Sequence, residues 1–390
     1  MSSNENDKKV SKEEVIERSW LSKNFVKSEF VFHAVILLLI WIMAFSVRLF
    51  SVFNFESMIH EYDPWFNFRS TKYLVDEGFY EFHNWFDKMT WYPLGRWVGN
   101  TVYPGLMWTS GIIHIFLHKV VNIPIVIRNV CVMLAPFMAG NTALATYGIT
   151  KEIMNGGSAL FAAFMVSLAP GYISRSVAGS YDNECVAIFA MVFAFYLWVK
   201  AVKTGNALWG ALAGIGYFYM VSTWGGYIFV INLIPLHVFV LLLAGKYTHR
   251  LYVAYNVFYC VGTLSSMCIS FVTWAPITST EHYAAMGVFG LLQIYTFYYF
   301  IKSLIPEQHM EVFIKFTLNS VFILLGSILF LAVTGFIPAL TGRLWRLLGA
   351  TSNIAIVKSV SEHQPSAWTV FFFAIILYMK LYLNHHLLPY

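Results

Sequence analysis

Long apolar runs alternate with short polar connections along most of this 390-residue chain. Runs of about 20 apolar residues are long enough to cross a hydrocarbon layer of ~30 Å as a helix. The pattern therefore predicts an all-α polytopic membrane protein. The predicted runs are residues 30–47, 101–117, 130–149, 158–173, 185–202, 207–222, 227–244, 251–274, 287–304, 316–340 and 368–383.

The run at residues 101–117 is short for a full crossing and contains Pro104, Gly105, Gly111 and His114. Its status can be decided from loop charge, because basic residues collect in cytoplasmic loops near span ends. If this run is re-entrant or interfacial, the chain has about ten spans.

With ten spans, the polar tail of residues 1–29 is cytosolic, since six Lys and Arg residues precede the first span. The remaining basic loops then also lie inside, while residues 51–117, 174–184 and 341–367 form loops on the outer face. Arg343 and Arg346 would be exceptions to the charge rule. The inside residues are Lys151, Lys200, Lys203, Lys246, Arg250 and Lys315.

This topology brings four carboxylates from three distant loops to one membrane face: Asp63, Asp182, Glu184 and Glu362. Grouped carboxylates repel one another unless a cation neutralises them, and hard oxygen ligands favour Mg²⁺, Mn²⁺ or Ca²⁺. An extended backbone would point Asp182 and Glu184 the same way. Pro64 is expected to keep the preceding Asp63 out of a helix.

Each signal has an ordinary structural alternative. Asp182 and Glu184 could simply favour the dipole of a following helix, and Glu362 could be a loop acid. Arg175 is a candidate for binding phosphate or for contacting a lipid headgroup. Trp224 could contact a ligand or anchor the chain at the membrane interface.

Composition agrees with a membrane protein: 58% of the residues are hydrophobic and 12% are charged. Soluble domains have about a quarter charged residues. The sequence contains no nucleic-acid-binding module, and its four cysteines have no metal-ligand spacing.

Four motifs occur in the order of one family: HEYDPWFNFR (60–69), SRSVAGSYDNE (174–184), STWGGY (222–227) and SVSEHQP (359–365). The chain resembles the catalytic subunits of eukaryotic oligosaccharyltransferase, over nearly its whole length after residue 30. The resemblance implies a C-type glycosyltransferase fold in the endoplasmic reticulum membrane, spanning residues 30–390. It also implies transfer of a preassembled oligosaccharide from dolichyl pyrophosphate to the Asn amide of Asn-X-Ser/Thr sequons in nascent polypeptides.

The family pattern implies roles for particular residues. Asp63, Asp182 and Glu184 correspond to the Mn²⁺ or Mg²⁺ site, and Glu362 to the group that contacts the acceptor amide. Asp63 and Glu362 are thus the expected catalytic residues, with Arg175 and Trp224 as candidates for donor binding. Other oligosaccharyltransferase subunits and the lipid bilayer are the implied partners, without nucleic acid.

Members of the family continue into a C-terminal lumenal domain whose WWDYG motif reads the sequon. No adjacent Trp pair occurs in this sequence, so we expect that domain to be absent and sequon binding by this chain alone to be weak. Three other readings stay open: a cation transporter, a C-type transferase using a dolichyl-phosphate monosaccharide, and an inactive fragment.

Overall fold

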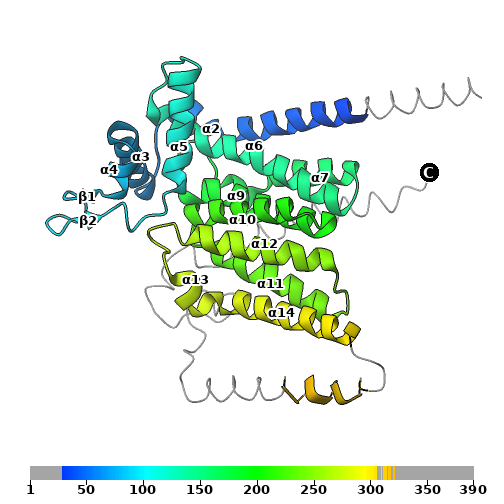
Figure 1. Cartoon of the computed structure of the whole chain (residues 1–390). Helices are drawn as coiled ribbons and strands as arrows, with labels where there is room; N and C mark the ends of the chain where they lie inside the picture. Colours follow the sequence, from blue (N-terminus) through cyan, green and yellow to red (C-terminus); the bar gives the residue numbers. More distant parts are fainter. Residues whose placement is uncertain (1–28, 305–308, 310, 314, 318, 321–390) are drawn as a thin grey trace, which may run out of the picture.

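The computed structural model describes residues 29–304, 309, 311–313, 315–317 and 319–320. Within these residues the chain is mostly helical, and the longer helices run side by side in one bundle (Figure 1). The first helix leads into α2 (Phe50–Phe55). The other long helices are α6 (Ile127–Ile153), α7 (Gly156–Leu168), α9 (Asn183–Thr204), α10 (Ala207–Thr223), α11 (Tyr227–Leu243), α12 (His249–Ser266) and α14 (Tyr283–Leu304).

A compact group of short elements covers one end of this bundle (Figure 1). In Figure 1, α5 runs across the ends of the bundle helices rather than beside them. This agrees with the expectation that residues 101–117 do not form a full span, because α5 has 11 residues and is followed by a π-helical turn. The group comprises α3 (Asp63–Glu77), α4 (Phe79–His83), antiparallel β1 (Phe86–Asp87) and β2 (Arg96–Trp97), α5 (Gly105–Ile115) and η1 (Phe116–Val120).

Side-chain caps determine where several bundle helices begin. Asn155, Asp182, Asn206 and Thr248 each accept a hydrogen bond from a backbone N–H in the first turn of the following helix. Such a cap satisfies one of the backbone donors left open at a helix start. The turn from α9 to α10 uses Gly205, whose φ of 69° lies in the left-handed region that glycine adopts readily.

Two expected spans are interrupted in the structure. The run at 158–173 breaks at Ala169, because the residue before a proline disfavours helical geometry, and Pro170–Ile173 forms the separate short helix α8. The run at 251–274 ends as a helix at Ser266 and continues through turns to α13 (Ala275–Thr278) and η2 (Thr280–His282).

Four helices among the described residues are long and apolar enough to cross a membrane: Glu29–Phe55, Ile127–Ile153, Asn183–Thr204 and Thr280–Leu304. Two shorter helices, Gly156–Leu168 and Tyr227–Leu243, are also apolar. The chain is therefore an all-α multi-pass membrane protein. The expected spans at residues 316–340 and 368–383 lie wholly or largely outside the described residues.

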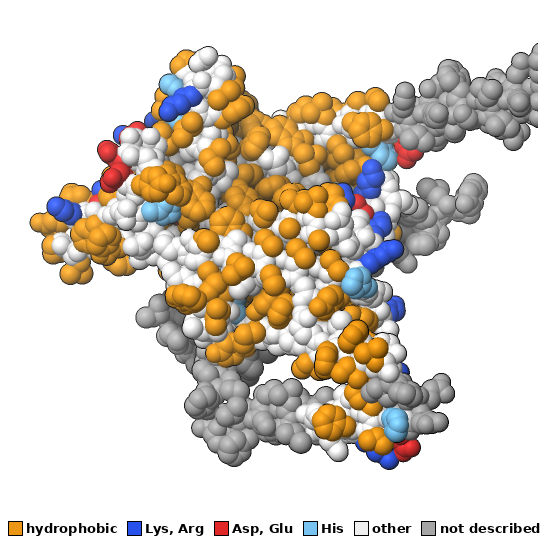
Figure 2. Space-filling model, in the orientation of Figure 1, with side chains coloured by type: hydrophobic (Ala, Val, Ile, Leu, Met, Phe, Trp, Pro, Cys, Tyr) orange, Lys and Arg blue, Asp and Glu red, His pale blue; other side chains and the backbone are white. Residues whose placement is uncertain are grey.

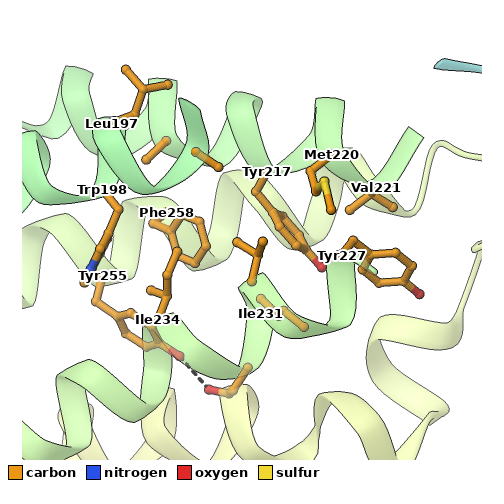
Figure 3. Packing of buried hydrophobic residues seen from close by; sticks show 14 of the residues in the cluster. Leu197, Trp198, Tyr217, Met220, Val221, Tyr227, Ile231, Ile234, Tyr255 and Phe258 are labelled. Atoms are coloured by element: carbon orange, nitrogen blue, oxygen red, sulfur yellow. Dashed lines mark hydrogen bonds between the residues drawn. The ribbon is translucent and has the colours of Figure 1, made fainter. Parts of the chain in front are cut away.

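Aromatic side chains from neighbouring helices form the bundle core (Figure 3). The rings of Trp198 on α9 and Tyr217 on α10 both lie within 6 Å of the Phe258 ring on α12, with centroids 5.6 and 5.8 Å away. Tyr255 is fully buried and donates its hydroxyl to the carbonyl of Ala285 over 2.9 Å. That bond satisfies the one polar group of this side chain and ties α12 to α14.

The two ends of the bundle differ in charge. Lys203 and Lys200 lie 3.1 and 3.8 Å from the carboxylate of Glu152, and Arg250 donates to the carbonyl of Lys203 over 3.3 Å. Figure 2 shows Lys and Arg side chains along this end, and an apolar surface between it and the end that α3 and α4 cover. Lys200, Lys203 and Arg250 thus lie together at the end opposite to α3, as loop charge predicts for these residues.

Glycines allow α10 and α12 to approach closely, as small residues do in membrane helix pairs. A Cβ at Gly214 would lie 3.0 Å from the backbone nitrogen of Gly262. We expect Gly214→Leu to force the helices apart and to lower the free energy of unfolding by about 1–3 kcal/mol.

Thermal unfolding in detergent measures this effect. Gly290→Leu on α14 is the matched control, since a Cβ there meets no atom within 4 Å. Equal stability losses in the two variants would contradict the packing account.

Candidate functional site

Two segments far apart in the chain pair at the covered end of the bundle. The backbone N–H of His60 donates to the carbonyl of Gly179 over 3.0 Å. One helical turn beyond Asp63, the Asn67 side-chain amide donates to the Tyr181 carbonyl over 3.2 Å and to an Asp182 carboxylate oxygen over 3.4 Å. The helix that begins at Asp63 is thereby joined to the segment carrying Asp182 and Glu184.

The close approach of these segments requires glycine at position 179. Gly179 has a φ of +92°, which other residues rarely adopt, and a Cβ there would lie 2.3 Å from the Met58 carbonyl oxygen and 2.6 Å from the His60 ring. No side chain fits into this space. The glycine therefore sets how closely the two segments pack.

The backbone at the acidic residues differs from the expected conformation. Asp182 is extended, but its carboxylate accepts the Asn183 N–H over 2.7 Å and so caps α9, which places Glu184 in the first helical turn. Asp63 is the first residue of α3, which can begin here because Pro64 is tolerated in the first turn of a helix. The Asp63 side chain is exposed. The expectations of an extended Asp-Asn-Glu stretch and of a non-helical Asp63 were wrong.

The two candidate donor-binding residues lie in different surroundings. The Arg175 guanidinium is 3.6 Å from a carboxylate oxygen of Glu184, with both side chains partly exposed. Trp224 follows α10, and its ring packs over Gly226, where a Cβ would lie 2.1 Å from the indole. Arg175 therefore pairs with an acid of the candidate site, whereas the Trp224 ring packs against the turn that follows α10.

Tyr181 connects the candidate site to the covering helices. Its buried hydroxyl lies 2.7 Å from the Thr71 hydroxyl on α3 and 2.5 Å from the Ser110 hydroxyl on α5. Burial raises the pKa of Tyr181 well above its usual range, so the phenol stays neutral and can donate a hydrogen bond. This one side chain joins α3, α5 and the start of α9.

Arg48 supports the same segment from the first span. The side chain is fully buried; it donates to the Ser176 hydroxyl over 2.7 Å and to the Ser167 carbonyl over 3.0 Å. Its guanidinium carbon lies 4.9 Å from the centroid of the Tyr172 ring, which adds a cation–π contact. The Arg48 carbonyl also accepts the N–H of Ala178 over 3.0 Å, so this residue holds the first part of the connection before Asp182 at two points.

Asp87 is an acid that stabilises the fold near the candidate site. Asp87, 3% exposed, lies 2.9 Å from Arg69 of α3 and accepts hydrogen bonds from Met89 and Thr90. Burial alone would raise the pKa of Asp87, but these hydrogen bonds and Arg69 outweigh it and lower that pKa. Asp87 therefore stays ionised and holds the β1–β2 ribbon against α3.

The oxygen atoms at the start of α9 are of the type that binds a hard divalent cation. Asp182 and Glu184 supply carboxylates at the start of α9, and the Asn183 side-chain oxygen between them is buried without a hydrogen-bond partner among the described residues. Carboxylate and amide oxygens are ligands of such ions. Still, no group of three or more His, Cys, Asp or Glu residues close enough for a metal occurs in the part of the chain described. The triad with Asp63 remains a prediction, and Glu362 lies outside the described residues.

Sequence analysis did not identify several residues that support the candidate site. Arg48 follows the first apolar run directly, and a charge at the edge of a span is a recognisable signal. Asn67 stands one helical turn after Asp63 and so shares a face of α3 with it. Tyr181 and Gly179 carry no such signal, because their roles depend on segments more than 60 residues away.

Comparison with known proteins now decides the family. The family model described as oligosaccharyl transferase STT3, N-terminal, matches residues 31–384. The chain belongs to this family. It is 49% identical over 358 residues to the dolichyl-diphosphooligosaccharide–protein glycosyltransferase subunit STT3 of Dictyostelium discoideum, covering 91% of this chain and 50% of that protein.

The subunit STT3 of Saccharomyces cerevisiae is similarly close, with 51% identity over 352 residues, 88% of this chain and 49% of that protein. The chain thus spans about half the length of the curated relatives it matches.

Solved structures resemble the fold of this STT3 family chain. The oligosaccharyltransferase AglB of Archaeoglobus fulgidus, in complex with an inhibitory peptide and a dolichol-phosphate, matches with a TM-score of 0.60 at 16% identity. The match covers 85% of this chain and 40% of the archaeal one. A complex of the Archaeoglobus fulgidus oligosaccharyltransferase with Zn and sulfate matches with a TM-score of 0.57 at 18% identity, over 77% of this chain and 40% of that one. The membrane fold is therefore the C-type glycosyltransferase fold.

Gly179 provides a direct test of how the site is assembled. We expect Gly179→Ala to separate residues 58–60 from residue 179, to unfold at a lower temperature and to expose the 56–62 connection to protease. The reason is the collision of the new methyl group with the Met58 carbonyl.

The matched control is Gly78→Ala, because Gly78 also has a positive φ, +101°, but a Cβ there meets nothing within 4 Å. That variant should lose only the cost of strained backbone, about 1 kcal/mol. Equal stability and equal proteolysis in both variants would show that the close contact has no structural role.

Proposed function

We propose that this chain transfers a preassembled oligosaccharide from dolichyl pyrophosphate to the side-chain amide of Asn in Asn-X-Ser/Thr sequons. In this proposal the chain is the membrane-embedded catalytic part of an oligosaccharyltransferase in the endoplasmic reticulum. Residues 1–29 form its cytosolic tail, and residues 51–117, 174–184 and 341–367 form lumenal loops. Other oligosaccharyltransferase subunits and nascent polypeptides are its partners.

One observation carries the proposal: the Asn67 amide bridges α3, which begins at Asp63, to the Asp182 carboxylate that caps α9. Acids from two distant parts of the chain thereby belong to one end of the bundle. The basic side chains Lys200, Lys203 and Arg250 lie at the other end. In a membrane protein this charge distribution favours the basic end as cytosolic and the acidic end as lumenal.

The proposed chemistry begins with a poor nucleophile. An amide nitrogen shares its lone pair with the carbonyl, which gives the C–N bond partial double-bond character. Asp63 and Glu362 are proposed to accept the two N–H bonds of the acceptor amide, to hold the group twisted and to weaken that resonance. In this proposal the lipid-linked oligosaccharide and the acceptor peptide are held at one surface, so their reaction becomes effectively unimolecular.

Asp63, Asp182 and Glu184 are the proposed ligands of an Mn²⁺ or Mg²⁺ ion. When bound, such an ion would stabilise negative charge that develops on the leaving pyrophosphate. Arg175 and Trp224 are proposed to contact the donor. Arg175 is already within ion-pair distance of Glu184, so it could orient that acid and also attract the anionic donor.

The test is glycosylation of a sequon peptide by microsomes in which this chain replaces the cell's own family member. We expect Asp63→Asn and Asp182→Asn each to reduce the transfer rate by about 100-fold or more, as loss of a charge-stabilising group does in other enzymes. Divalent ion titration should show weaker activation of both variants.

Asp76→Asn is the matched control, because Asp76 is an exposed acid on the same helix as Asp63. It should retain the wild-type rate. Unchanged transfer by Asp63→Asn and Asp182→Asn would exclude the proposed catalytic role and favour an inactive fragment. Ion flux through vesicles that hold the purified chain would instead favour a transporter.

A further inference from the structure

A groove lies between α6 and α9 and reaches the basic end of the bundle. Its volume is about 490 Å³, within the range of roughly 300–1,000 Å³ that small-molecule sites occupy. Leu144, Phe189 and Phe193 supply apolar lining, and Lys151, Tyr196 and Lys200 lie toward the end where α6 and α9 finish. The groove is therefore mostly apolar, with Asn141 as a polar residue in its lining, and its end holds two lysines and Glu152.

The charges at the basic end are only partly balanced. Lys200 hydrogen-bonds to the Tyr196 hydroxyl over 3.1 Å and lies 4.0 Å from the centroid of the Trp209 ring. Glu152 lies 3.8 Å from Lys200 and is closer to Lys203, at 3.1 Å.

Lys151 contacts the Tyr147 ring at 5.4 Å and is not within ion-pair distance of a carboxylate among the described residues. Of the residues that line the groove, Lys151 and Lys200 against Glu152 leave one net positive charge. Lys203, next to the groove, pairs with Glu152 and so reduces the share of that acid that Lys200 receives.

The groove belongs to the membrane. Its lining comes from Ile127–Ile153 and Asn183–Thr204, both long and apolar enough to cross a bilayer. Lys200 stands 17 residues after Asn183, which corresponds to roughly 25 Å along the helix. The basic end is thus separated from Asp182 and Glu184 by nearly the thickness of the hydrocarbon layer, and a ligand there is not a substrate at those acids.

We propose that this groove binds an anionic phospholipid. The phosphate lies against Lys151 and Lys200, near the Tyr196 hydroxyl, and one acyl chain runs along Leu144, Phe193 and Phe189. Charge complementarity supports this ligand, because anionic lipids are enriched in the cytoplasmic leaflet and each nearby lysine adds to their attraction. The charge distribution of the bundle assigns the basic end to that leaflet.

The lining also fits a lipid better than a soluble anion. A free phosphate would satisfy the lysines but would leave the apolar length of the groove without a ligand. A lipid fills both parts, and the long stems of Lys151 and Lys200 can follow the acyl chain while their ammonium groups reach the headgroup.

The experiment uses the full 390-residue chain purified in detergent and mixed with equal amounts of phosphatidylinositol and phosphatidylcholine. Native mass spectrometry then measures the lipid retained. We expect a preference for phosphatidylinositol that falls about fivefold in Lys151→Gln and more than tenfold in Lys151→Gln/Lys200→Gln. Lys246→Gln, an exposed lysine outside the groove lining, is the control and should keep the preference.

Two further measurements separate the alternatives. Thermal unfolding in phosphatidylcholine alone checks that the variants fold, and added phosphatidylinositol should then raise the unfolding temperature of wild type more than that of the double variant. Millimolar inorganic phosphate should not displace the lipid. Equal retention of both lipids, an equal loss in Lys246→Gln, or displacement by phosphate would each overturn the proposal.

Discussion

The hydrogen bonds that fix residues 176–182 are the constraint on which the candidate site depends. This short connection is bound to the first span through Arg48 and Ser51, and the Gly179 N–H donates to the carbonyl of Val132 on α6 over 3.0 Å. Tyr181 adds contacts to α3 and α5. Buried backbone groups need such partners, so the connection has few other conformations available, and Asp182 is held where it caps α9.

The buried guanidinium of Arg48 makes this arrangement costly to break. Leaving a buried hydrogen-bond donor without its acceptor commonly costs about 1–3 kcal/mol, and more when the donor is charged. Here the partners are hydroxyl and carbonyl oxygens together with an aromatic ring rather than a carboxylate. The positive charge therefore orients the chain before Asp182 without neutralising an acid of the candidate site.

The bundle, the position of its charged ends and the irregular nature of residues 101–117 were predictable from sequence. Apolar length and loop charge are properties of local segments, so they need no knowledge of packing. The local backbone at Asp63 and Asp182 was predicted wrongly, because proline position and side-chain capping decide it. Gly179 and Tyr181 were missed for another reason: their importance arises from contacts with distant segments.

Two ends of one helical bundle thus carry different chemistry. At one end, α3 and α9 each begin at an acid, and Asn67 of α3 links the two starts through its hydrogen bond to Asp182. At the other end, basic side chains surround the ends of α6 and α9 and suit contact with a membrane surface. The length of α9, about 33 Å for its 22 residues, separates these two regions by about the thickness of a hydrocarbon layer.

The most direct measurement is side-specific labelling of one introduced cysteine at a time in sealed vesicles, in a chain that keeps the buried Cys131 and Cys185 and whose exposed Cys260 and Cys268 are replaced by serine. A membrane-impermeant maleimide is applied to Asp63→Cys, Glu184→Cys and Lys203→Cys. We expect positions 63 and 184 to react from the same side and position 203 only from the other. Labelling of positions 63 and 184 from opposite sides would contradict the account.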